Sequence, residues 1–323
     1  MMEARELNKD EYDTWDEIVD ISPYGTVFHK SQWVNNVARL LNKTPKIYGI
    51  FLNGKLVGGC SFYVYSSKFV KVASSKVATT PYGGLVLKYT SGATRKMEDL
   101  HKRAINCLCE MFNSNGYDYV ELVNSPAFVD IRPFIHNGWR SSVYYTYYLN
   151  LTKDIDRSIS KKTRNVIRKA EKEGITIRKM TDVEEFYKLY SMTYTRQGLN
   201  TPVNIEFFDE MINLIKRENM GKMWFAKTST GELASAEVFV WDEKRAYRWV
   251  AGSHPSLRKT GATSYLLYHI FNELKEKDFT EVNLMGANTP HLAIFLTGFN
   301  PKLVPYFSVK KTNLLANILE KVY

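Results

Sequence analysis

The residues best suited to chemistry lie between an expected strand, Arg245 to Gly252, and an amphipathic helix that begins at Ala262. A helix N-terminus presents free N–H groups and the positive end of its dipole, which together attract anions. Glycine lets the backbone approach a ligand closely, and neighbouring basic side chains add positive charge. The pattern predicts a phosphate-binding loop, although an ordinary capped helix would look the same. The residues of this loop are Arg258, Lys259, Gly261, Ala262 and Thr263.

Glu237 is the candidate for acid–base chemistry, because it lies in an otherwise apolar expected strand, Leu233 to Trp241. An amine that attacks an ester or thioester carbonyl needs a group that accepts its proton. Burial would raise the pKa of such a carboxyl group towards the range of a useful base. Two other interpretations stay open: an edge residue that faces water, or a partner for Arg245 or Arg248 on the next strand.

Further candidates flank this carboxylate along the chain. Tyr247 and Trp249 alternate on the adjoining strand, so both are expected on one side, where they line an acceptor pocket or pack in the core. Asn288 and His291 follow an expected strand, Glu281 to Met285, where a substrate groove would open. His291 is suited to proton transfer near neutral pH, or it is a surface residue at the start of a helix.

A basic stretch from Arg157 to Lys172 holds seven basic side chains and one acid, Glu171. Its pattern is helical, and residues four apart share a face of a helix. Such a stripe binds the phosphates of a nucleotide, a tRNA or a carrier, or it is a solvated surface. The candidate contact residues are Arg164, Arg168 and Lys169.

Composition limits the class of protein. The chain has 323 residues, 44% hydrophobic residues and a net charge of +10, which suits two domains and an anionic substrate or partner. Its three cysteines form a sparse, odd set that indicates a reducing compartment, and no metal site is expected. Because no apolar run is long enough to span a membrane and no signal peptide is recognisable, we expect a cytoplasmic protein. The oligomeric state is not predicted.

The two halves of the sequence follow the same order of elements. Each has a hairpin, with turns at Gly54 and Gly231, followed by a helix, a strand, a segment that begins with proline and an aromatic strand. The order predicts an α/β (α+β) fold with duplicated domains at residues 1–150 and 151–323. A cleft between the two domains is a natural site for a substrate.

Five ordered segments carry a resemblance to a known family. They are residues 25–33 (G-T-V-F-H-K-S-Q-W), 162–174 (K-T-R-N-V-I-R-K-A-E-K-E-G), 249–253 (W-V-A-G-S), 283–287 (N-L-M-G-A) and 295–299 (F-L-T-G-F). Over roughly residues 20–310 the chain resembles the Fem family, the peptidoglycan-bridge aminoacyltransferases within the GNAT-like acyltransferase superfamily. The loop R-x-x-G-x-T resembles the GNAT pyrophosphate loop, [QR]-x-x-G-x-[GA], and Thr263 departs from it.

The resemblance implies two tandem GNAT-like domains, each a mixed, mostly antiparallel sheet flanked by helices. It implies an acceptor side in the first domain and a donor side in the second. The implied activity is transfer of an aminoacyl group from a tRNA-type donor to an amine of a cell-envelope precursor or similar carrier, without a tightly bound cofactor. It also suggests Tyr306 as the acid for the leaving group and Lys30 and Trp33 as substrate contacts, although Trp33 also fits a buried anchor of its helix.

Two departures keep alternatives open. Leu296 replaces a lysine that the family uses in handling the tRNA end, and Tyr82 opens a turn that often carries an arginine in relatives. Tyr82 is retained as a candidate substrate contact. The alternatives are an acyl-CoA-dependent N-acyltransferase acting on a small amine and a non-catalytic RNA-binding protein of the same fold.

Overall fold

The computed structural model describes residues 1–67, 69–88 and 94–313, which belong to two compact units. The first unit comprises residues 1–144 and 305–323, and the second comprises 145–304. The predicted division at residue 150 differs from this one at the C-terminus, because the last strand pairs within the first unit through Ser308–Thr312. The last ten residues of the predicted second domain lie outside the described residues.

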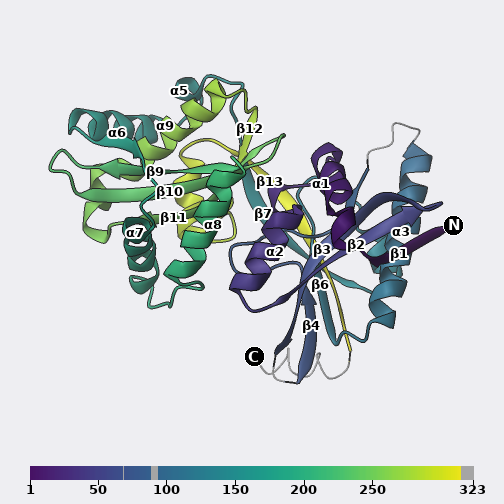
Figure 1. The fold of residues 1–323 in the computed structure, drawn as a ribbon. Helices are drawn as coiled ribbons and strands as arrows, with labels where there is room; N and C mark the ends of the chain where they lie inside the picture. Colours follow the sequence, from purple (N-terminus) through teal and green to yellow (C-terminus); the bar gives the residue numbers. More distant parts are fainter. Residues whose placement is uncertain (68, 89–93, 314–323) are drawn as a thin grey trace. The chain divides into compact units, whose positions relative to one another are not determined.

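The first unit has one mixed sheet with helices on both faces (Figure 1). The strand order is β1-β2-β3-β4-β6-β13, with β5 beside β3, and β4 with β6 is the parallel pair. In chain order the elements are β1 (Met2–Glu6), α1 (Tyr12–Ile21), α2 (Ser31–Leu40), β2 (Thr44–Leu52), β3 (Lys55–Ser67), β4 (Val70–Ser74), β5 (Val86–Leu87), α3 (Thr94–Ser114), β6 (Tyr119–Val123), α4 (Arg132–His136) and β13 (Lys302–Thr312).

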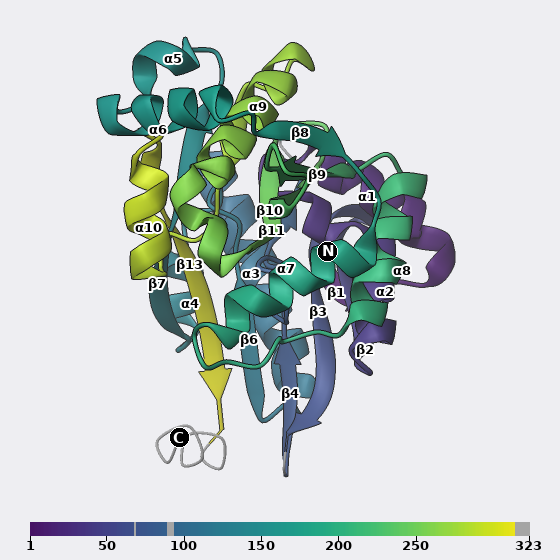
Figure 2. The ribbon, with the colours of Figure 1, turned by 90° about the vertical axis from the view of Figure 1, so that its left-hand side faces the viewer.

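The second unit repeats this arrangement in the order β8-β9-β10-β11-β12-β7, with β11 and β12 parallel. Helix α9 lies over one face of its sheet, and α7 and α8 lie over the other (Figures 1 and 2). In chain order the elements are β7 (Arg140–Asn150), α5 (Ile155–Ser158), α6 (Lys161–Lys172), β8 (Thr176–Lys179), α7 (Val183–Thr195), α8 (Ile205–Arg217), β9 (Gly221–Lys227), β10 (Leu233–Trp241), β11 (Ala246–Ser253), a 3-10 helix (Pro255–Thr260), α9 (Ala262–Glu276), β12 (Glu281–Asn283) and α10 (Pro290–Thr297).

The duplication predicted from the sequence is confirmed by the matching strand orders. The β2–β3 hairpin turns at Gly54 and the β9–β10 hairpin at Gly231, and both glycines have the positive φ that such turns need. The closing strands are exchanged between the halves of the sequence. Tyr148–Asn150 of β7 pair with β12, and Ser308–Thr312 of β13 pair with β6.

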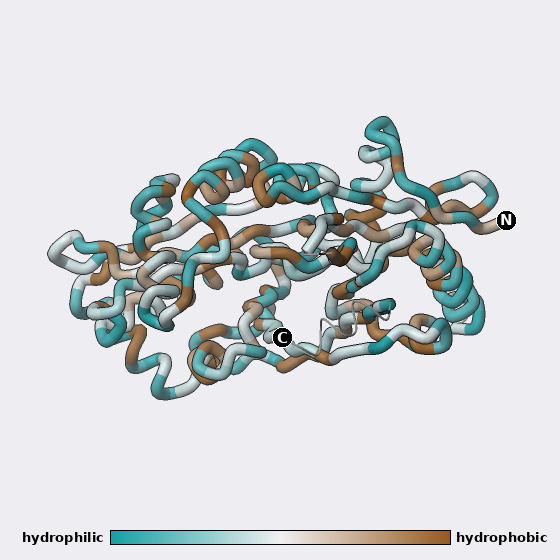
Figure 3. The backbone as a smooth tube through the Cα atoms, turned by 90° about the horizontal axis from the view of Figure 1, so that it is seen from below, coloured by the Kyte–Doolittle hydropathy of each residue, from teal (hydrophilic) through white to brown (hydrophobic). Residues whose placement is uncertain are grey.

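Each unit has its own hydrophobic core between helices and sheet. The helices carry hydrophobic residues where they face the strands and hydrophilic residues on the outside (Figure 3). Four helices of the second unit begin with a side-chain cap: Asp154 for α5, Ser160 for α6, Asp182 for α7 and Asn204 for α8. Among the described residues, no helix combines the length and apolar character needed to cross a membrane.

Candidate active site

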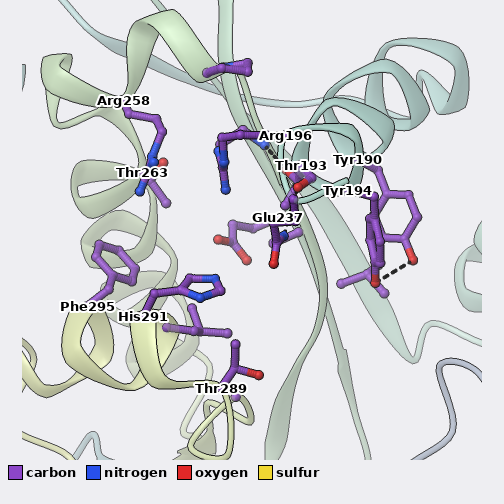
Figure 4. Close-up of a pocket in the computed structure, with 18 of the residues that line it drawn as sticks. Tyr190, Thr193, Tyr194, Arg196, Glu237, Arg258, Thr263, Thr289, His291 and Phe295 are labelled. Atoms are coloured by element: carbon purple, nitrogen blue, oxygen red, sulfur yellow. Dashed lines mark hydrogen bonds between the residues drawn. The ribbon is translucent and has the colours of Figure 1, made fainter. Parts of the chain in front are cut away.

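A cavity of about 1240 Å³ opens in the second unit where β11 separates from β12 (Figure 4). The two parallel strands pair only at Ala246–Val282 and Tyr247–Asn283. Beyond these pairs, residues 248–253 of β11 line the cavity together with α7, α9 and α10. The splayed strands therefore leave one backbone edge of β11 open to a bound molecule.

A β-bulge decides which aromatic residue of β11 faces this cavity. Val238 pairs with Val250 and Phe239 pairs with Arg248, so Trp249 is the extra residue. Trp249 lines the cavity, as predicted, whereas Tyr247 is fully buried and donates to Asp242 at 2.8 Å. The two aromatic residues therefore differ in exposure, and only Trp249 reaches the cavity surface.

Glu237 reaches the floor of the cavity from β10 and is 0% exposed. Its two carboxylate oxygens accept hydrogen bonds from Arg248 Nε at 2.7 Å and Nη2 at 2.6 Å. Burial raises the pKa of Glu237, and the guanidinium opposes this rise. The partner that the sequence left open is therefore Arg248, because Arg245 pairs with Glu281 at 2.9 Å. Each carboxylate oxygen keeps a further lone pair that can accept a proton.

One end of the cavity is cationic. Arg258 and Lys259 of the 3-10 helix line it, together with Arg196 from the end of α7. Burial lowers the pKa of Arg196, and the nearby Arg258 guanidinium lowers it further. Figure 4 shows both arginines at the end of the cavity where Thr263 lies in the first turn of α9. Two like charges held together beside a helix N-terminus form a strong anion site.

The N-terminus of α9 is capped by Gly261, which has no side chain to accept from the first N–H groups of the helix. Thr260 Oγ1 accepts from Ala262 N at 3.3 Å. Thr263 and Ser264 line the cavity, whereas Ala262 is buried and does not. The predicted loop thus contributes Arg258, Lys259, Gly261 and Thr263 to the cavity surface.

Comparisons with known proteins agree with this geometry. Residues 157–291 match the family model described as "Acetyltransferase (GNAT) domain". This matching segment, the GNAT domain, makes up most of the second unit. No curated protein matches the chain by sequence.

Over nearly its whole length the chain is similar in fold to solved structures. FemX has a similar structure, with a TM-score of 0.71, 13% identity and coverage of 94% of this chain and 96% of FemX. The C-terminal domain of a putative lysylphosphatidylglycerol synthetase from Agrobacterium fabrum gives a TM-score of 0.61, 12% identity and coverage of 97% and 95%. A tandem GNAT protein from the clavulanic acid biosynthesis pathway gives a TM-score of 0.55 at 13% identity. The match covers 96% of this chain and 98% of that protein.

Gly261 of the GNAT domain has a structural role that its sequence motif did not reveal. Its φ is +79°, and a Cβ there would lie 2.7 Å from Val166 Cγ1 and 2.9 Å from Val166 O of α6. The missing side chain therefore admits α6, and the predicted approach of a phosphate to Gly261 stays a prediction.

Gly261→Ala is expected to destabilise the GNAT domain by roughly 1–3 kcal/mol, because a non-glycine residue at positive φ is strained and the new methyl group clashes with α6. Urea denaturation will measure this loss. Gly231→Ala is the control, since φ there is also positive, at +90°, but open space surrounds the Cβ position. Equal losses at both positions would show that the contact with α6 is unimportant.

The basic side chains of α6 point in different directions. A second cavity of about 590 Å³ is lined by Lys161, Lys162, Asn165, Val166 and Lys169, and Val166 also lines the first cavity. Arg164 instead donates to Ile159 O at 3.1 Å, and Arg168 lines neither cavity. Of the three predicted contact residues, Arg164, Arg168 and Lys169, only Lys169 lines a cavity.

Some residues in and near α10 line the cavity, and others have structural roles. His291 and Phe295 line the cavity, and Figure 4 shows His291 and Glu237 pointing into the same space. Asn288 holds β7 instead, because it accepts from Tyr145 N and donates to Tyr145 O, both at 2.9 Å. Leu296 is fully buried in the core.

The candidates outside the GNAT domain belong to the first unit. Trp33 is a buried anchor that donates to Thr80 Oγ1 at 2.9 Å. The ammonium group of Lys30 forms an ion pair with Asp20 at 2.5 Å. Tyr82 is fully buried, and its ring packs edge-on against Tyr306 at 5.4 Å. Substrate contacts by these residues, and the acid role of Tyr306, stay predictions.

Sequence reasoning missed the contribution of α7. Tyr190, Thr193, Tyr194 and Arg196 all line the cavity from this helix or its end. The only local signal was an aromatic, polar segment, which also suits an exposed helix. Packing of α7 on β11 brings these residues to the site. Among the described residues, no cluster suited to a metal ion occurs.

Proposed function

We propose that this protein transfers an aminoacyl group from a tRNA-type donor to an amine of a cell-envelope precursor or a similar carrier. The observation that carries this proposal is the single cavity that joins a buried carboxylate, Glu237, to a cationic end at Arg196 and Arg258. The second unit is then the donor side and the first unit the acceptor side. A cytoplasmic location accompanies this assignment.

The cationic end suits the terminal phosphates of the donor. The guanidinium groups of Arg196 and Arg258 can bind a phosphodiester from two sides. The backbone N–H groups of Thr263 and Ser264, in the first turn of α9, add donors in a fixed direction. An anion here relieves the repulsion between the two guanidinium groups, so donor binding and charge neutralisation are coupled.

The basic face of α6 supports a donor larger than a small nucleotide. Lys161, Lys162 and Lys169 surround the second cavity, which shares Val166 with the first. The three lysines are exposed. Lys169 pairs with Glu173 at 3.5 Å, and such an exposed pair is weak enough to open for a phosphate. A polynucleotide that enters the first cavity by its end would lie across this face.

The chemistry follows from the floor of the cavity. The acceptor amine attacks the ester carbonyl, a C–N bond forms, and the C–O bond to the donor ribose breaks. Glu237 accepts the proton that the amine loses, while Arg248 holds the carboxylate in place. The leaving ribose oxygen needs a proton, for which His291 at the cavity wall is the candidate. The open backbone edge of β11 supplies N–H groups for the charge on the carbonyl oxygen.

The comparisons support aminoacyl transfer as the class of reaction. FemX and a protein described as a putative lysylphosphatidylglycerol synthetase share the fold over nearly the whole chain. The second candidate function is N-acylation with acyl-CoA. The loop at Arg258 favours it, as does the buried Leu296 that stands where the Fem family uses a lysine.

Binding of an RNA minihelix that carries a stable 3′-aminoacyl amide is expected to weaken steeply as salt rises. Each phosphate contact adds about −0.7 to the log–log slope for single strands and about −0.9 for duplexes. Lys162→Ala with Lys169→Ala should therefore flatten the slope by about 1.4 to 1.8. Fluorescence anisotropy across a salt series measures it.

Arg168→Ala with Lys172→Ala is the matched control, because it removes the same charge from α6 at positions that line neither cavity. It should change the slope much less. A minihelix that fails to bind at low salt, while acetyl-CoA binds and is consumed with an amine, would replace the proposed donor by acyl-CoA. Equal slopes for both double variants would show that the second cavity is no RNA site.

A further inference from the structure

At one position on the open backbone edge of β11, a side chain of α7 occupies the N–H group. His254 N donates to Ala234 O at 2.9 Å, so the neighbouring residue of this antiparallel ladder, Ser253, turns its N–H away from β10. That N–H donates to Thr193 Oγ1 at 3.1 Å. Ala251, two residues earlier, presents its N–H at the same edge. Of these two backbone positions, only Ala251 is left for a ligand.

Thr193 is held firmly in this position. Its hydroxyl donates to Leu189 O at 3.1 Å, so its proton is used within α7 while a lone pair accepts from Ser253. Helix α7 cannot easily shift, because it packs on Gly252 without space for a side chain. A Cβ on Gly252 would lie 2.5 Å from Leu189 C and Tyr190 N.

The two donor classes differ in what they need from this edge. The pantetheine arm of coenzyme A carries amide groups, and an extended amide chain binds a strand edge by pairing with alternate residues. An aminoacyl ester has no such arm, since its acyl group is attached directly to a ribose oxygen. A closed edge therefore penalises the first class and leaves the second unaffected.

We infer that Thr193 is a specificity-determining residue that closes the β11 edge to pantetheine thioesters and so selects ester-linked aminoacyl donors. This inference rests on the proposed function and names the group that makes the choice. Thr193 acts by occupying the Ser253 N–H, so removal of its hydroxyl should admit the amide arm.

The test compares coenzyme A with 3′-phospho-ADP, its nucleotide part without the arm. Calorimetry gives the ratio of the two dissociation constants, which isolates the contribution of the arm. In the unmodified protein the two ligands should bind about equally. In Thr193→Ala, coenzyme A should bind roughly 3- to 10-fold more tightly than the nucleotide, as one recovered hydrogen bond predicts. Thr193→Ser keeps the hydroxyl and should behave like the unmodified protein, and thermal melting of each variant confirms folding.

Two results would overturn the inference. If coenzyme A already binds the unmodified protein much more tightly than the nucleotide does, the edge accepts the arm with Thr193 in place. If the arm contributes nothing in Thr193→Ala either, another feature excludes it. Aminoacyl transfer from the RNA donor is measured separately. Its failure would reject the proposed function, while the ratio of dissociation constants would still report on Thr193.

Discussion

Arg248→Met is expected to lower the free energy of unfolding at pH 7 by about 3–5 kcal/mol, the usual cost of removing one partner of a buried ion pair. Arg248 is 8% exposed and Glu237 is 0% exposed, so water cannot replace the lost hydrogen bonds. Without the guanidinium, burial alone acts on Glu237 and raises its pKa further. The loss should therefore shrink as the pH falls and the carboxylate is protonated. Urea denaturation at pH 7 and pH 5 measures both effects.

The double variant with Glu237→Leu should recover most of the stability, because it leaves no buried charge. Arg217→Met is the control for loss of an exposed pair. Arg217 contacts Glu218 at 2.8 Å, its side chain is 64% exposed, and its replacement should cost less than about 1 kcal/mol. A comparable loss for both arginines would show that the pair on the cavity floor is not buried in solution.

Glu237→Gln is expected to lower the rate of single-turnover acyl transfer by about 10²- to 10⁴-fold, the usual contribution of a general base. The substitution keeps the shape of the side chain but removes its ability to take a proton. Glu273→Gln is the control. Glu273 also lies in the second unit and binds Lys179 at 2.9 Å, but it does not line the cavity. Its substitution should leave the rate within a few-fold.

The pH dependence adds a second readout for Glu237. Burial raises the pKa of this carboxyl group, so its proton persists above the ordinary range for glutamate, near 4.3. The base is lost as the pH falls through the raised pKa, which places the acid limb of the rate profile above that range. In Glu237→Gln the limb should disappear. A profile whose acid limb survives the substitution would assign the base to another group.

Much of the fold could be predicted from the sequence, because the spacing of apolar residues within a segment indicates whether it forms a helix or a strand. The apolar strand from Leu233 to Trp241 and the amphipathic helix that begins at Ala262 occur where the sequence placed them. The repeated order of these elements predicted the duplication. Such patterns depend only on residues that are close together in the sequence, so they can be recognised without knowledge of the tertiary structure.

Residues of the candidate site could be predicted from the sequence only where they belong to one continuous segment. The loop from Arg258 to Thr263 was predicted as a unit, and all of its members except Ala262 and Thr260 line the cavity. Glu237 was noticed because an acid in an apolar strand is costly unless it is paired. Its partner stayed open, because a one-residue change in register decides which side chain of β11 faces it.

The sequence by itself determined the order of elements, the duplication and the basic loop at the start of α9. Tertiary structure decided the rest. The bulge at Trp249 set the register that pairs Phe239 with Arg248, packing of α7 brought Arg196 to Arg258, and the closing strands were exchanged. The physical reason is that helical and strand periodicity is local, whereas register and strand pairing depend on the packing of segments far apart in the chain.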